Sequence, residues 1–368
     1  MTATPPRLLV LGAGFAGVWA AIAAAETAAA AGPVRIDLVA PTDRFVPRPR
    51  LYERSPAETT VALADVLTPR GVGHIRATAT GIDTGARTVT VTDDDGDERR
   101  LDYDRLILAT GSQLNRPPID DTHLHDVDTL AAAEALDQRL SELDSGATIA
   151  VVGAGFTGIE LATELPARVP TANVVLLEKS DQIGRPLGDD ARPAIEAAID
   201  ELGVDVRTGV MVRAYDGTRV ELADGASFPA DVVVWTTGMR ASPLTAAISD
   251  DLDPLGRLSV DQNLRVHDAP EVFAAGDTAA PLDESGHTVA QSAQHAIPQG
   301  ACAGRNAVAD LVGAPLAELQ TLPYGTCLDL GAAGAVFTEG WDRKVVLVGD
   351  EAKALKRDIN TVWIYPPA

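Results

Sequence analysis

Positive charge is scarce in this 368-residue chain. Its 30 lysine and arginine residues are outnumbered by 53 acidic residues, so the formal net charge is −23. A surface this acidic repels nucleic-acid phosphates and anionic lipid head groups. The composition therefore excludes a nucleic-acid partner, and it limits any contact with a membrane to a peripheral one.

Cysteine is almost absent. The chain holds only Cys302 and Cys327, with no C-x-x-C pair and no cysteine–histidine cluster of zinc spacing. His123 and His125 make a poor metal site because further ligands are missing around them. We predict no metal site, two small buried side chains rather than a redox pair, and a reducing compartment, the cytoplasm.

Long hydrophobic runs are missing as well. A membrane span needs ~20 consecutive apolar residues, and no stretch of this length qualifies. The apolar N-terminal stretch LLVLGAGFAGVWAAIAAAE contains three glycines and turns polar at Glu26. This pattern favours a phosphate-binding strand, turn and helix over a signal peptide. We expect a cytoplasmic protein that could lie peripherally at the inner face of a membrane.

The chain does contain the same glycine pattern twice. The stretch RLLVLGAG ends in Gly12 and Gly14, and Gly17 follows. The stretch ATIAVVGAG ends in Gly153 and Gly155, and Gly158 follows with the same G-x-G-x-x-G spacing. Each apolar stretch predicts a buried parallel strand, and a helix and a second strand are expected after it.

The similarity extends beyond the two glycine turns. Each copy continues into a hairpin, which turns at Asp95-Gly96 in the first copy and at Asp224-Gly225 in the second. A strand that ends at Gly111 or Gly238 then follows. Two whole domains are therefore predicted to share one plan.

Each pattern has a physical role in binding a dinucleotide. The first glycine permits a tight turn, the second lets the backbone approach a pyrophosphate, and the third lets helix and strand pack closely. The pyrophosphate charge is stabilised by the free N–H groups and the dipole at the helix N-terminus. Two such sites imply two dinucleotides and electron transfer between them.

The residue at the end of the second strand differs between the copies. Glu178 in the second copy is placed to accept hydrogen bonds from the ribose hydroxyls of NADH and to repel the 2′-phosphate of NADPH. We therefore favour NADH there, although Lys179 follows directly. The first copy has Ala40, so either Thr42, Asp43 or backbone groups replace the carboxylate, or the affinity for the nucleotide is weaker.

These motifs resemble the two-dinucleotide-binding-domain flavoproteins of the pyridine nucleotide-disulfide oxidoreductase superfamily. Within it, the chain is most similar to the branch of type II NADH dehydrogenases and of ferroptosis-suppressor and apoptosis-inducing-factor-like proteins. The resemblance rests on both glycine patterns and on LILATGS, VVWTTGM and VFAAGDTA, the last at residues 272–279. It covers nearly the whole chain.

The resemblance implies that the first copy binds FAD and the second binds NADH. The implied FAD residues are Gly12, Gly14, Phe15, Ala16, Gly17, Ala40, Arg50, Ala79, Ala109, Thr110, Gly111, Gly276 and Asp277, and the implied NADH residues are Gly153, Gly155, Gly158, Glu178 and Gly238. Arg50 is chosen from the segment FVPRPRLYER, in which Arg48 and Arg54 are further candidates for the pyrophosphate.

Two residues are implied to act near the reacting groups. Glu160 follows the second glycine pattern and is expected beside the nicotinamide, and Gln294 is expected at the acceptor face of the flavin. Related quinone reductases have paired glutamines in the segment that corresponds to SAQHAIPQGACAGRNAVADLVG, which contains Gln294. Here Pro298 replaces one of them and must start or kink the helix, and His295 could deliver a proton or be structural.

The resemblance implies an α/β fold of two Rossmann-like domains with the NAD domain inserted in the FAD domain, and a small C-terminal α+β cap. We expect the FAD domain at residues 1–113 and 252–320, the NAD domain at 114–251 and the cap at 321–368. The expected activity is transfer of hydride from NADH to the flavin and then to a quinone or quinone-like small acceptor. A reductase of a small electron-carrier protein, a slow NADH-binding redox sensor and a homodimer remain open.

Overall fold

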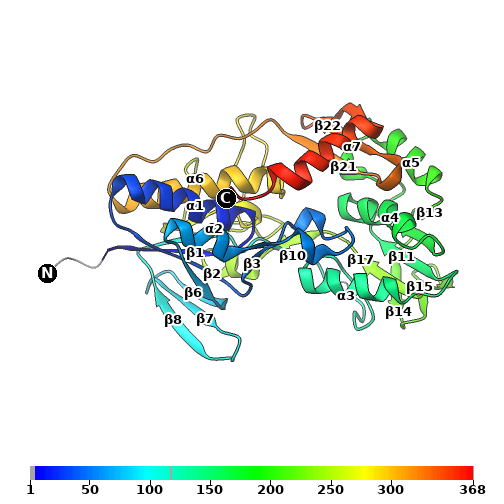
Figure 1. Ribbon diagram of the computed structural model, residues 1–368, viewed down its shortest axis with the longest axis horizontal. Helices are drawn as coiled ribbons and strands as arrows, with labels where there is room; N and C mark the ends of the chain where they lie inside the picture. The colour runs from blue at the N-terminus through cyan, green and yellow to red at the C-terminus, as the bar shows by residue number, and fades with distance from the viewer. Residues whose placement is uncertain (1–4, 117, 368) are drawn as a thin grey trace.

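The computed structural model describes residues 5–116 and 118–367, and it contains two parallel sheets placed end to end along its long axis (Figure 1). The first sheet has six strands in the order β19-β20-β9-β1-β2-β5. Its strands are β1 (Arg7–Leu11), β2 (Arg35–Ala40), β5 (Gly73–Arg76), β9 (Arg105–Leu108), β19 (Arg265–Val266) and β20 (Ala269–Ala274). All pair in parallel except β19 with β20.

The second sheet repeats the arrangement around β11. Four parallel strands lie in the order β13-β12-β11-β17. They are β11 (Thr148–Val152), β12 (Asn173–Leu177), β13 (Asp205–Arg207) and β17 (Val232–Trp235). In both sheets the first strand of the copy is central and almost fully buried, because its neighbours are parallel strands and helices cover the sheet. The expected α/β class with two Rossmann-like units is confirmed.

Helices cover the two sheets. The first half carries α1 (Phe15–Ala31), α2 (Leu63–Leu67) and α6 (Ala293–Leu311), and the second half carries α3 (Leu130–Ser141), α4 (Phe156–Arg168) and α5 (Arg192–Glu201). No helix in the described part of the chain is both long and apolar enough to span a bilayer. Short single-turn helices include η1 (Arg48–Arg50), η2 (Pro56–Thr59), η4 (Arg185–Leu187) and η6 (Gly276–Thr278).

The hairpins expected in both copies are present. One small antiparallel sheet consists of β6 (Thr78–Asp83), β7 (Thr88–Thr92) and β8 (Glu98–Asp102), and the other of β14 (Val212–Tyr215), β15 (Arg219–Leu222) and β16 (Ser227–Pro229). Gly96 and Gly225 have φ values of 86° and 89°. The left-handed conformation that each tight turn requires therefore falls on a glycine.

Two extended segments connect the halves. β10 (Ser112–Leu114) leaves the first half, as Figure 1 shows, and β18 (Met239–Ala241) returns to it. The two strands pair in antiparallel fashion. A further short pair, β3 (Arg44–Phe45) with β4 (Val61–Ala62), begins the loop that lies between the halves. The domain boundaries proposed near residues 113 and 251 lie close to this two-stranded connection.

The last part of the chain forms a small α+β unit. It comprises β21 (Gly325–Asp329), β22 (Ala335–Glu339), β23 (Lys344–Val348), α7 (Gly349–Asp358) and the π-helical turn η8 (Ile359–Trp363). We call residues 321–367 the cap. β21 and the turn after it, at Gly331, lie against α4, and α7 packs on the three cap strands. The tail crosses back to the first half (Figure 1), where the Tyr365 hydroxyl donates to the Thr59 carbonyl at 2.7 Å.

In the first half, the backbones of α1 and α6 pack in close contact. A Cβ atom on Gly300 would lie 2.1 Å from the Ala16 carbonyl oxygen, and one on Gly304 would lie 2.2 Å from the Ala20 carbonyl oxygen. The two backbones can approach only because these positions lack side chains. The helix begins at Ala293, so Pro298 lies inside it and does not start it.

A Gly300→Ala substitution is expected to lower the free energy of unfolding by about 1–3 kcal/mol, because α6 must move away from α1 to admit a methyl group. Urea unfolding of the purified proteins measures this change. Arg305→Ala, on an exposed position of the same helix, is the matched control and should differ little from the parent. Equal stability of the Gly300→Ala protein would contradict the proposed packing.

Candidate functional site

The two glycine turns have nearly the same geometry. Gly12 and Gly153 end their strands with φ values of 104° and 105°, a left-handed conformation that favours glycine. Gly14 and Gly155 then cap α1 and α4 with extended backbones, φ −81° and −86°. Each helix N-terminus therefore points its free N–H groups out of the turn, at the carboxyl edge of a parallel sheet.

The remaining glycines divide into positions of packing and positions of open space. A Cβ atom on Gly17 would lie 1.9 Å from the Gly12 carbonyl oxygen, and one on Gly158 would lie 1.7 Å from that of Gly153. By contrast, a Cβ atom on Gly14 or Gly155 would meet no heavy atom within 4 Å. The space in front of both helices can thus take a diphosphate that a side chain would obstruct.

The ends of the second strands confirm which residues correspond. The Gly12 amide donates to the Val39 carbonyl at 2.9 Å, and the Gly153 amide donates to the Leu177 carbonyl at 2.8 Å. The next residues, Ala40 and Glu178, are therefore equivalent positions.

Glu178 and Ala40 differ sharply in what they contact. The Glu178 carboxylate accepts from the Ala154 and Ser180 amides, both at 2.7 Å, so it is fixed beside the second glycine turn. Ala40 is 2% exposed and its carbonyl accepts from the Ala77 amide. The Thr42 hydroxyl accepts from the Arg44 amide at 3.1 Å, while Asp43 is exposed. Ala79, the other implied contact in this region, lies half-buried on β6, the strand that follows Ala77.

The third strand of each copy also ends in matching positions. The Ala109 amide donates to Leu11 at 2.9 Å and the Thr236 amide donates to Val152 at 3.0 Å. Gly111 and Gly238 then follow with φ values of 68° and 66°. Within the described chain, the Thr110 hydroxyl is buried without a hydrogen-bond partner. These residues line the turns at the edge where Rossmann-like sheets bind their ligands.

Gly276 and Asp277 close the first site. A Cβ atom on Gly276 would lie 2.9 Å from the Ala16 Cβ atom, so this turn lies against the first turn of α1. The Gly276 amide donates to the Gln299 side chain at 2.7 Å. The Asp277 carboxylate accepts from the Ser112 hydroxyl at 2.6 Å. Residues predicted from three separate motifs, the glycine pattern, LILATGS and VFAAGDTA, are thus brought together around the first glycine turn.

The three arginines of the 45–54 segment have different partners. Arg48 pairs with Asp128, and its Nη1 atom lies 3.9 Å from the Asp277 carboxylate. Arg50 pairs with Glu53 at 2.7 Å and donates to the Tyr365 hydroxyl, and the hydrogen bond to Glu53 is the main reason that the pKa of Arg50 is raised. Arg54 is exposed and donates to a backbone carbonyl. The proposed contact of Arg50 with the pyrophosphate stays a prediction, and Arg48 is the arginine nearest to Asp277.

Glu160 is placed in a buried polar network that reaches into the cap. It is 7% exposed, and its Oε1 atom accepts from the Lys356 ammonium at 2.7 Å and from the Asp329 amide at 3.1 Å. Burial raises the pKa of Glu160 although Lys356 opposes the shift. Burial works against the charged form of Lys356, but Glu160 more than compensates, so the pKa of Lys356 is raised as well.

The same network includes the loop between the halves. The Tyr52 hydroxyl donates to the Asp329 carboxylate at 3.1 Å, and Lys353 pairs with the other oxygen of that carboxylate. Burial raises the pKa of Tyr52 well above its usual value. Residues from the 45–60 loop, from α4 and from the cap are therefore held together. The proposed role of Glu160 beside the nicotinamide stays a prediction.

Gln294 lies at the start of α6, where its amide donates to the Pro323 carbonyl at 2.7 Å. The neighbouring His295 is buried, its Nδ1 atom lies 3.1 Å from the Ala290 carbonyl, and burial lowers its pKa. Its ring stacks on Tyr324, which stacks in turn on Trp341. These contacts favour the structural interpretation of His295, and they join the segment around Gln294 to the cap.

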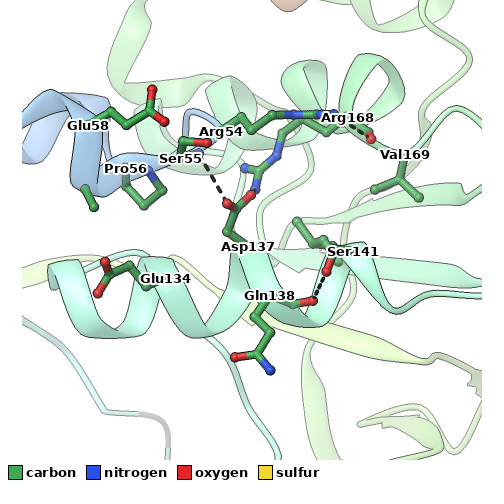
Figure 2. Close-up of a pocket in the computed structure, with 12 residues that line it drawn as sticks. Arg54, Ser55, Pro56, Glu58, Glu134, Asp137, Gln138, Ser141, Arg168 and Val169 are labelled. Carbon is green, nitrogen blue, oxygen red and sulfur yellow. Dashed lines mark hydrogen bonds and ion pairs between the residues drawn. The ribbon is translucent and has the colours of Figure 1, made fainter.

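A surface hollow lies away from both glycine turns. It has a volume of about 470 Å³ and is bounded by η2, α3 and the end of α4 (Figure 2). Figure 2 shows Arg168 pointing at Asp137, with which it pairs at 2.6 Å, and the Ser55 amide donating to the same carboxylate. These contacts pair the polar groups of the hollow with one another and join the 45–60 loop to the second half. Because none of these residues belongs to a glycine turn, we do not assign the hollow to nucleotide binding.

Both cysteines are free thiols on different elements, Cys302 on α6 and Cys327 on β21. Burial raises the pKa of Cys327 to about 11, so its reactive thiolate form is scarce at neutral pH. Within residues 5–116 and 118–367, no cluster of three or more potential metal ligands occurs.

A family model agrees with this site. The model described as pyridine nucleotide-disulphide oxidoreductase matches residues 6–300, which include both glycine turns and the Gly276-Asp277 motif.

Curated relatives match the chain over nearly its full length. The NADH dehydrogenase-like protein MT1860 of Mycobacterium tuberculosis is 44% identical over 98% of this chain and 94% of its own length. The demethylphylloquinone reductase NdbB of Synechocystis is 31% identical over 92% of this chain and 88% of its own length.

Solved structures show the same fold. A structure of NDH2 from Plasmodium falciparum in complex with NADH superposes with a TM-score of 0.82 over 99% of this chain and 95% of that one, at 14% identity. The sulfide:quinone oxidoreductase from Aquifex aeolicus superposes with a TM-score of 0.78 over 96% of this chain and 90% of that one, at 19% identity.

Proposed function

The chain belongs to the pyridine nucleotide-disulphide oxidoreductase family, and from this we propose that it is an FAD-dependent enzyme that oxidises NADH and reduces a quinone or quinone-like small molecule. The observation that carries the proposal is the pair of matched glycine turns in one chain, each with open space before a helix N-terminus. When bound, the flavin supplies the two-electron chemistry that links nicotinamide to acceptor.

The chain contributes mainly by binding and orienting the two nucleotides. Gly14 and Gly155 leave room for the diphosphates, and the free N–H groups of α1 and α4 stabilise their charge. Gly276 brings Asp277 to the first site, where Ser112 and Arg48 fix the carboxylate. Because the two halves are tied by the 45–60 loop and the cap, the two ligands would be held in a constant relative position, which is the principal source of rate in such reactions.

NADH rather than NADPH is the nucleotide that we propose for the second site. The Glu178 carboxylate is fixed by two backbone amides and retains lone pairs for the 2′- and 3′-hydroxyls of a ribose. The same charge would repel a 2′-phosphate. The exposed Lys179 next to it weakens this discrimination to some extent.

A Glu178→Ala variant is expected to lose most of this preference. Removing a charged acceptor of hydroxyl hydrogen bonds costs about 1.5–3 kcal/mol, roughly 10- to 100-fold in kcat/KM for NADH. The kcat/KM for NADPH should rise or stay constant, because the repulsion is gone. Steady-state kinetics with both nucleotides measures the ratio, and Glu196→Ala on α5 is a control with the same charge change. Parallel losses for NADH and NADPH would contradict the assignment.

The quinone acceptor is supported by the relatives and by the cysteines. Two of the similar proteins are named for quinone reduction, the demethylphylloquinone reductase of Synechocystis and the type II NADH:quinone oxidoreductase of Staphylococcus epidermidis. Cys302 and Cys327 lie on separate elements and offer no pair for disulfide exchange, despite the family's name. Gln294, in the segment joined to the cap, is the residue that we propose for the acceptor face.

The proposal is tested by anaerobic mixing of the flavin-loaded protein with NADH, followed by addition of a panel of quinones. Rapid loss of the oxidised-flavin absorbance, then rapid recovery with a quinone, is the expected result. Flavin that is reduced by NADH but recovers no faster with any quinone than with oxygen would remove the quinone assignment. Flavin that NADH leaves oxidised would remove the whole proposal.

A further inference from the structure

The turn between β22 and β23 brings one arginine of the cap over the second glycine turn. The guanidinium carbon of Arg343 lies 4.4 Å from the ring centre of Tyr324 and 5.7 Å from that of Phe156. Phe156 is the first residue of α4. Arg343 therefore lies close to the helix N-terminus that faces the second nucleotide site, although it belongs to a segment far along the chain. Figure 1 shows β22 and α7 on the α4 side of the molecule.

This turn is fixed on the rim of the second site. The Val345 amide donates to the Asp190 carboxylate at 2.9 Å, and a Cβ atom on Gly188 would lie 2.8 Å from the Arg343 Cβ atom. Arg343 itself has a φ of 56°, a left-handed conformation that costs free energy for a residue other than glycine. The surrounding contacts thus hold Arg343 in a defined place.

Arg343 forms no ion pair within the described part of the chain, although Asp190 accepts from the amide of nearby Val345. Within the described chain, no carboxylate lies within ion-pair distance of this half-buried guanidinium, whose hydrogen-bond acceptor is the Thr326 hydroxyl at 3.3 Å. Arg48, Arg50 and Arg168 each pair with an acidic residue, whereas the half-buried Arg44 and Arg139, like Arg343, donate to hydroxyl or carbonyl oxygens. An anionic ligand at this place would accept charge-assisted hydrogen bonds from a guanidinium that no carboxylate of the described chain already occupies.

We propose that Arg343 binds the diphosphate of the nicotinamide nucleotide at the second site. This inference rests on the proposed function, because it takes the second glycine turn as the site of NADH. The N–H groups at the start of α4 stabilise the diphosphate from one side, and the guanidinium of Arg343 donates to it from the side of the cap. The cap is then a part of the nucleotide site and supplies its cation.

The test compares Arg343→Met with Lys344→Met in the flavin-loaded protein. Lys344 is the next residue and is exposed, so its replacement makes the same change in net charge outside the site. The probe is ADP-ribose, whose affinity is measured by isothermal titration calorimetry without any turnover. We expect Arg343→Met to weaken binding about 10-fold and to reduce the dependence of affinity on salt, with Lys344→Met within about twofold of the parent. Arg343→Lys should restore part of the affinity.

The outcomes separate this inference from the proposed function. If the parent protein binds ADP-ribose and Arg343→Met binds it equally well, the role of Arg343 is wrong while the proposed function stands. If the parent protein does not bind ADP-ribose, both are wrong. A purely structural role for Arg343 would instead lower the thermal midpoint and leave the salt dependence of binding unchanged, which would also overturn the inference.

Discussion

A Gly14→Val variant is expected to fold but to be purified without FAD and therefore colourless. A Gly155→Val variant is expected to keep its FAD, and so to be yellow, but its flavin should not be reduced by NADH. A Cβ atom at either position would meet no heavy atom within 4 Å, and both backbones are extended, so we expect the fold to tolerate valine. The same side chain would occupy the space of a diphosphate in front of α1 or α4. We expect a loss of about 3 kcal/mol or more, roughly 100-fold in Kd, for the affected nucleotide only.

Flavin content after purification and the rate of flavin reduction by NADH measure the two effects separately. Melting temperatures close to that of the parent show that the variants fold. Gly96→Val, at a hairpin turn remote from both sites, controls for the loss of a glycine, although its φ of 86° makes some destabilisation expected. A colourless Gly155→Val protein together with a yellow Gly14→Val protein would reverse the assignment of FAD and NADH to the two halves.

Replacing Lys356 by methionine is expected to destabilise the protein by about 3–5 kcal/mol at pH 8, because Glu160 would then be a buried charge without its partner. The double variant Glu160→Gln with Lys356→Met should recover most of this loss, since no charge stays buried. Urea unfolding of the parent, the single variant and the double variant measures the coupling. Equal stabilities of the single and double variants would show that the pair is not coupled.

The loss should also depend on pH, with a sign fixed by the pKa of Glu160. Burial raises this pKa in the folded state, and without Lys356 it would rise further. The folded single variant then binds a proton more tightly than the unfolded chain does, so its stability falls as the pH rises above the pKa of the unfolded glutamate. The deficit of Lys356→Met against the parent should therefore be smaller near pH 5 than near pH 8. A deficit that grows toward acid would contradict this account.

The glycine turns could be predicted from the sequence because their requirements are local. A strand that ends in left-handed φ and a helix that packs against it leave few choices but glycine, as Gly12 and Gly17 illustrate. The correspondence of Ala40 with Glu178 could be read from the order of strand, helix and strand alone. The hydrogen bonds from Gly12 and Gly153 to the neighbouring strands bear it out.

The partners of the charged residues could not be predicted in this way. Glu160 and Lys356 are 196 positions apart, and nothing in the sequence near either residue indicates the other. Arg48 and Arg50 alternate with prolines in one segment, and which of them adjoins Asp277 is decided by the packing of the 45–60 loop against β10. The contacts among the 45–60 loop, α4 and the cap depend on the tertiary structure, which short sequence patterns do not encode.

The polar network of the cap has a consequence for how such proteins can change over time. Tyr52, Glu160 and Asp329 come from the interdomain loop, α4 and the cap, and Asp329 joins the other two by accepting from the Tyr52 hydroxyl and donating its amide to Glu160. If the cap were replaced by the corresponding segment of another protein, that segment would need a lysine at the position of Lys356. Without it, the buried Glu160 carboxylate would have no counter-charge. The end of the chain is thus coupled to the second half, and a replacement of Lys356 would call for a matching replacement of Glu160.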